Sequence, residues 1–120
     1  MLDHFERPRN VGEVEQADAA AEVENPACGD VMRLSLRLRN GRIAEARYRA
    51  QGCVTAIACG SRLTEMLQGR TPDQARTLRR DDLVASLGGL IPETMHASHL
   101  AMDALAAALT QLQASRAAGQ

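Results

Sequence analysis

Three short segments of the sequence hold side chains of the types that bind metal ions. Cys28 and Asp30 flank a glycine in the segment NPACGD at 25–30, and Cys53 ends the segment QGC at 51–53. His96 stands at the expected start of a long C-terminal helix. Two thiolates, one carboxylate and one imidazole from three separate loops are a sufficient donor set for a tetrahedral metal site.

Each of these residues also has an ordinary structural interpretation. Free cysteines are often small buried hydrophobes, so spacing alone favours Cys28 and Cys53 equally as ligands and as core thiols. Asp30 after a glycine suits a turn, and His96 suits an exposed helix start. The third cysteine, Cys59, falls on the apolar stripe of the helix that follows Cys53, which predicts a buried structural cysteine.

The elements that must position these segments are strands early in the chain and helices late. A short strand is expected at 21–25, and two alternating, half-buried strands at 31–39 and 43–50. Capping and stop signals then predict the helices at 54–68, from the N-cap Thr71 to 78, at 82–87 and from 94 or 95 to 117. This order predicts an α+β fold with an antiparallel sheet.

The alternation in the two long strands also predicts their register. Pairing apolar with apolar residues places Leu36 opposite Ala46 and Leu38 opposite Ala44. A two-residue Asn-Gly loop would instead pair Leu36 with a charged residue. We therefore expect a loop of three or five residues, with Gly41 in a left-handed or bulge conformation.

The composition limits the class of protein. The chain has 120 residues, 45% of them hydrophobic, which predicts a single domain over 1–120 with an aliphatic core, since Phe5 and Tyr48 are its only aromatic residues. A net charge of −1 gives no indication of nucleic-acid or anionic-membrane binding. We expect no export signal and no membrane span. Three cysteines then predict reduced thiols in a cytoplasmic protein.

Four segments together resemble a known family over nearly the whole chain. They read DHFERPRNVG at 3–12, NPACGDVMRL at 25–34, QGCVTAIACGS at 51–61 and MHASHLAMDAL at 95–105. In this order and spacing they resemble the IscU proteins and the N-terminal domain of NifU, which are scaffolds for iron–sulfur cluster assembly. The resemblance implies a three-stranded antiparallel sheet with helices packed on one face. It also implies a [2Fe–2S] cluster, or zinc or iron in its place, at a tip formed by three loops.

The same resemblance assigns roles to single residues. Cys28, Cys53 and His96 match three family ligands, and Asp30 matches the aspartate that keeps the cluster labile. It implies a scaffold with no catalytic residue, which receives sulfur from a cysteine desulfurase and passes clusters to apo iron–sulfur proteins. The family's third cysteine, its main sulfur acceptor, is replaced here by Ala97. We therefore expect a weakly held cluster and poor sulfur transfer.

A second departure concerns a chaperone partner. Family members that use a dedicated Hsp70-type chaperone carry LPPVK before the histidine, whereas residues 90–94 here read LIPET. The sequence therefore does not predict that interaction. Two alternatives to the scaffold stay open: a zinc-bound sulfur-transfer protein of the U type, with zinc-dependent sulfurtransferase activity, and a degenerate paralogue that regulates a cysteine desulfurase.

Overall fold

The structure, a computed structural model, describes residues 10–25, 29–51, 54–87 and 95–118. The strands are β1 (Ala19–Asn25), β2 (Asp30–Arg39) and β3 (Arg42–Gln51). The helices are α2 (Val54–Leu67), α3 (Pro72–Arg76), α4 (Arg80–Ser86) and α5 (Met95–Ala118). The predicted strands and helices are confirmed, with bounds that differ by a few residues. No described helix is long and apolar enough to cross a membrane.

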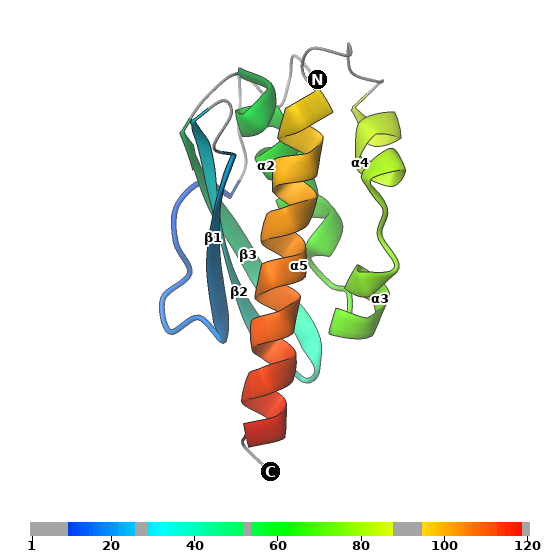
Figure 1. Cartoon of the computed structure of the whole chain (residues 1–120). Helices are drawn as coiled ribbons and strands as arrows, with labels where there is room; N and C mark the ends of the chain where they lie inside the picture. Colours follow the sequence, from blue (N-terminus) through cyan, green and yellow to red (C-terminus); the bar gives the residue numbers. More distant parts are fainter. Residues whose placement is uncertain (1–9, 26–28, 52–53, 88–94, 119–120) are drawn as a thin grey trace.

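The three strands form one antiparallel sheet in the order β1-β2-β3. Helix α5 packs on β1 and β2, α2 packs on β3, and the two helices pack against each other. Figure 1 shows these helices on one side of the sheet, with α3 and α4 beyond them. The predicted α+β class with helices on one face is therefore confirmed.

The turn between β2 and β3 is shorter than the alternation predicts. Arg39 pairs with Arg42, so the loop contains only Asn40 and Gly41. Both have positive φ, 55° and 77°, which is the backbone of a two-residue type I′ turn. The expected left-handed conformation of Gly41 is confirmed, but the expected loop of three or five residues is wrong.

A bulge in β3 supplies the register shift that the loop does not. Leu36 pairs with Ala46 as predicted, whereas Leu38 pairs with Ile43 and not with Ala44. The pairing shifts by one residue between these two pairs, which leaves Ala44 without a partner in the ladder. Ala44 is consequently exposed and Ile43 is buried, the reverse of a strictly alternating strand.

The core lies between the sheet and the helices and is almost entirely aliphatic. One stripe of α5 is buried throughout: Leu100, Ala101, Ala104, Leu105, Ala108 and Leu112. Cys59 of α2 is fully buried in the same core, which confirms its prediction as a structural cysteine.

Residues 10–18, before β1, form a crossing segment that covers part of the face of the sheet opposite the helices. Val11 forms a parallel bridge with Tyr48 of β3, and the backbone N–H of Gly12 donates to the Tyr48 carbonyl at 2.8 Å. The N–H of Val14 donates to Oγ of Ser35 at 3.0 Å. Ser35 lies on the side of its strand that carries Arg33 and Arg37, yet this crossing segment buries it to 2% exposure.

Candidate functional site

Five element ends lie at the same end of the molecule. Figure 1 shows the end of β1, the start of β2, the end of β3 and the starts of α2 and α5 all at its upper edge. The strand ends are paired with one another: Asn25 of β1 pairs with Asp30 of β2, and Val31 of β2 pairs with Gln51 of β3. Cys28 and Cys53 lie in the segments that join these ends, and Asp30 and His96 lie at the starts of β2 and α5.

Asp30 is the one candidate ligand whose side chain lies among the described residues. It begins β2 and is only 8% exposed. Gly29 before it has φ of 72°, a left-handed backbone that glycine adopts without strain and that turns the chain into the strand. Asp30 thus places a mostly buried carboxylate at the edge where the strands end.

The other candidate ligands lie outside this description. Cys28, Cys53 and the side chain of His96 are not among the described residues, so the predicted convergence of the four side chains stays a prediction. Within the described part of the chain, no three His, Cys, Asp or Glu side chains are grouped to hold a metal ion.

Two helix N-termini give this end of the fold a favourable potential for anionic groups. Helix α2 has 14 residues and α5 has 24, and neither carries an acidic residue in its first turn. The unpaired N–H groups and the dipole at such an end stabilise negative charge and lower the pKa of a nearby thiol. Cys53 immediately precedes α2 in the sequence, and His96 is the second residue of α5.

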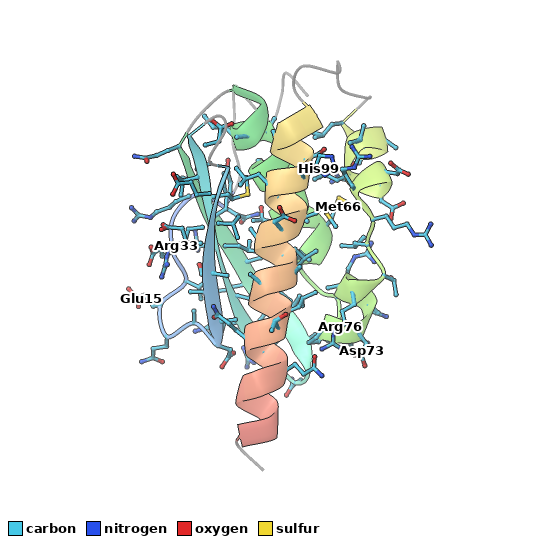
Figure 2. All side chains as sticks on the ribbon, viewed as in Figure 1. Glu15, Arg33, Met66, Asp73, Arg76 and His99 are labelled. Atoms are coloured by element: carbon cyan, nitrogen blue, oxygen red, sulfur yellow. The ribbon has the colours of Figure 1, made fainter. Side chains whose placement is uncertain are left out.

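Ala97 lies on the inner side of the first turn of α5. Its side chain is 1% exposed and belongs to the hydrophobic core, and the neighbouring Ser98 is also buried. His99 is exposed, as is Asp103 one turn later. Figure 2 labels His99 on the part of α5 nearest α4.

A second gathering of charged side chains lies on the face of the sheet opposite the helices. Figure 2 labels Arg33 and Glu15 on that side. Nε of Arg33 lies 2.8 Å from Oε1 of Glu13, and Glu45 pairs with Arg37 and Arg47. The opposite charges offset one another, so this face offers no concentrated positive field for an anionic ligand.

Sequence patterns did not predict what the buried Tyr48 contacts in α2. Tyr48 of β3 is 1% exposed, and its hydroxyl donates to the Ile57 carbonyl at 2.9 Å. A Cβ at Gly60 would lie 2.4 Å from Cδ2 of the Tyr48 ring, so the ring requires glycine there. A glycine inside an apolar helix pattern is a signal of such a close approach.

The observed architecture defines a class of small α+β domain, in which a three-stranded antiparallel sheet is covered on one face by helices. Residues 1–118 match the family described as NifU-like N terminal domain. The chain belongs to this family.

Named relatives agree with this assignment. The iron-sulfur cluster assembly scaffold protein IscU 1 of Archaeoglobus fulgidus is 43% identical over 109 residues, which are 91% of this chain and 71% of that protein. The IscU scaffold protein of Escherichia coli is 38% identical over 122 residues, covering 98% of this chain and 94% of the relative. The crystal structure of a nitrogen-fixing NifU-like protein (N-terminal) from Brucella abortus matches with a TM-score of 0.74 at 21% identity, covering 93% of this chain and 90% of that one.

Proposed function

We propose that this chain is a scaffold or carrier that holds an iron–sulfur cluster as cargo and passes it to apo iron–sulfur proteins. The observation that carries the proposal is the family match over residues 1–118, which includes every segment that contains a candidate ligand. The two relatives described above are named as assembly scaffolds and not as enzymes. Their sequences align with nearly all of this chain.

The proposed ligands are Cys28, Asp30, Cys53 and His96, and the proposed cargo is a [2Fe–2S] cluster. Thiolates are the firm ligands of such clusters, whereas a carboxylate or an imidazole holds iron less firmly. Two helix N-termini without acidic first turns support thiolates at this end of the fold. Zinc or iron is the alternative occupant of the same donor set.

The proposed sulfur donor is a cysteine desulfurase. Sulfur transfer from such an enzyme needs a thiolate on the acceptor, and Cys28 and Cys53 are the two candidates in the proposed ligand set. Alanine at position 97 supplies no third thiol. We therefore propose that this chain holds its cluster weakly and transfers it readily to apo iron–sulfur proteins. We propose no Hsp70-type chaperone partner, because residues 90–94 read LIPET.

Anaerobic reconstitution with iron, L-cysteine, a reductant and a cysteine desulfurase tests this proposal. The wild-type chain is expected to develop the visible absorption of a [2Fe–2S] cluster and to lose it when an apo-ferredoxin is added. Cys28→Ser and Cys53→Ser should each abolish the chromophore. Cys59→Ser serves as the matched control and should retain it, because Cys59 is fully buried in the core.

The competing functions give different results in the same experiment. A colourless chain that binds stoichiometric zinc contradicts the cluster scaffold and supports zinc-bound sulfur transfer. A chain that binds neither metal nor cluster but changes the turnover of the desulfurase supports the regulatory paralogue.

A further inference from the structure

Tyr48 contacts the start of α2 at two points on one helix face. Its hydroxyl donates to the carbonyl of Ile57, in the first turn, at 2.9 Å. Its ring lies so close to Gly60, in the second turn, that a Cβ there would lie 2.4 and 2.6 Å from Cδ2 and Cε2. Positions three residues apart share a helix face. One side chain thus fixes both the direction and the distance of the first two turns relative to β3.

The Tyr48 hydroxyl is a dependable donor for this contact. Tyr48 is 1% exposed, and burial raises its pKa from 10.0 to about 12. The phenol is therefore neutral and keeps its proton at any physiological pH. The carbonyl of Ile57 is an acceptor with two lone pairs, so it can accept this bond in addition to a helical one.

The backbone of Tyr48 is itself held from both sides. It pairs with Leu34 of β2 on one side. On the other, its N–H donates to the Asn10 carbonyl at 3.0 Å and its carbonyl accepts from Gly12 at 2.8 Å. Asn10 in turn donates through Nδ2 to Oγ1 of Thr64 in α2, at 3.2 Å. Tyr48 thus joins the sheet, the crossing segment and α2 at one place.

We propose that Tyr48, together with Gly60, is a positioning residue for the metal-binding end of the molecule. It sets where α2 begins on the sheet, and Cys53 is the residue immediately before α2. The inference rests on the proposed function, because it assumes that Cys53 is a ligand. The side chain touches no ligand directly and acts through the first turns of the helix. Outer partners that orient ligands in this way typically change metal affinity by about 10- to 100-fold.

A matched pair of variants tests the inference. Tyr48→Phe removes one buried hydroxyl and keeps the ring, so it should fold. Ser35→Ala also removes one buried hydroxyl, whose partner is the backbone of Val14 on the opposite face. Both variants should lower the urea midpoint by similar amounts. Only Tyr48→Phe is expected to weaken zinc binding, by about tenfold in competition with a chromophoric chelator.

Amide hydrogen exchange of the metal-free chain supplies a readout that needs no metal. In Tyr48→Phe, exchange should become faster in the second turn of α2, where the N–H groups have helical partners, whereas in Ser35→Ala these amides should stay as protected as in the wild type. Equal zinc affinity in Tyr48→Phe and the wild type overturns the positioning role, and the proposed function stands. A wild-type chain that binds neither zinc nor a cluster overturns both. If zinc binding is weakened equally in the two variants, the cause is the loss of global stability, and the positioning role is also overturned.

Discussion

The sequence predicts the burial of some side chains well and the contacts of others poorly. The burial of Cys59 follows from its place on an apolar helical stripe, and the structure confirms it. Gly60 inside an apolar helix pattern signals a close approach, but Tyr48 could not be predicted as its partner, because periodicity gives the face on which a residue lies and not its partner across the core. The burial of Ser35 could not be predicted either, because the segment that covers it has no periodic pattern. The ligand roles of Cys28 and Cys53 stay predictions.

The substitution of Ala97 by cysteine tests the expected role of the missing thiol. Ala97→Cys should raise both cluster retention and persulfide transfer from a cysteine desulfurase, because it adds a firm ligand at a helix N-terminus. Ala97 is 1% exposed, so the added sulfur must fit next to the core. We expect this to lower the free energy of unfolding by at most about 3 kcal/mol. Reconstituting both chains side by side, with the decay of visible absorption as the readout, measures the effect.

Ala97→Ser is the matched control for this comparison, because it adds one atom without a firm ligand. It should behave as the wild type does in cluster retention. A wild-type chain that assembles a stable cluster as fast as Ala97→Cys would mean that another residue has replaced the third cysteine.

The secondary-structure elements follow closely from the sequence, and the errors have a clear cause. Thr71 is the N-cap of α3 as predicted. Its Oγ1 accepts from the N–H of Gln74, and the Gln74 side chain accepts from the N–H of Thr71, which completes a capping box. In the hairpin, alternation predicts which pairs must form but not how the chain achieves them. A tight turn plus a bulge at Ala44 and a longer loop give the same pairing of Leu36 with Ala46. Sequence periodicity alone cannot distinguish these two solutions.

The type I′ turn makes a prediction at Gly41. Its φ is 77°, and an added Cβ would meet no atom within 4 Å, so backbone strain is the only cost of a side chain there. Gly41→Ala should reduce the free energy of unfolding by about 1–2 kcal/mol. Gly41→Asn should reduce it less, because asparagine tolerates the left-handed region better. Urea unfolding of the two variants checks this, and equal losses would contradict the type I′ turn.

The two faces of the sheet differ in what covers them. One face of the sheet carries the helices and the aliphatic core, and the other carries the crossing segment and balanced ion pairs. Figure 1 shows that the strands end, and α2 and α5 begin, at the same end of the molecule. Relatives at 38–43% identity align over most of the chain, and the fold persists in a structure at 21% identity. The fold tolerates this sequence divergence because many different aliphatic residues can keep the alternating strand pattern and the apolar helix stripes.

The central claim is that Cys28 and Cys53, far apart in the sequence, bind one metal ion at this end of the fold. Anaerobic titration with Co²⁺ tests it most directly, because each thiolate ligand adds intensity to the ligand-to-metal charge-transfer band. The wild-type chain should bind one Co²⁺, and Cys28→Ser and Cys53→Ser should each reduce the band per bound ion to about half. Cys59→Ser should leave it unchanged. A wild-type chain without a thiolate band, or a band that only Cys59→Ser removes, would contradict the account.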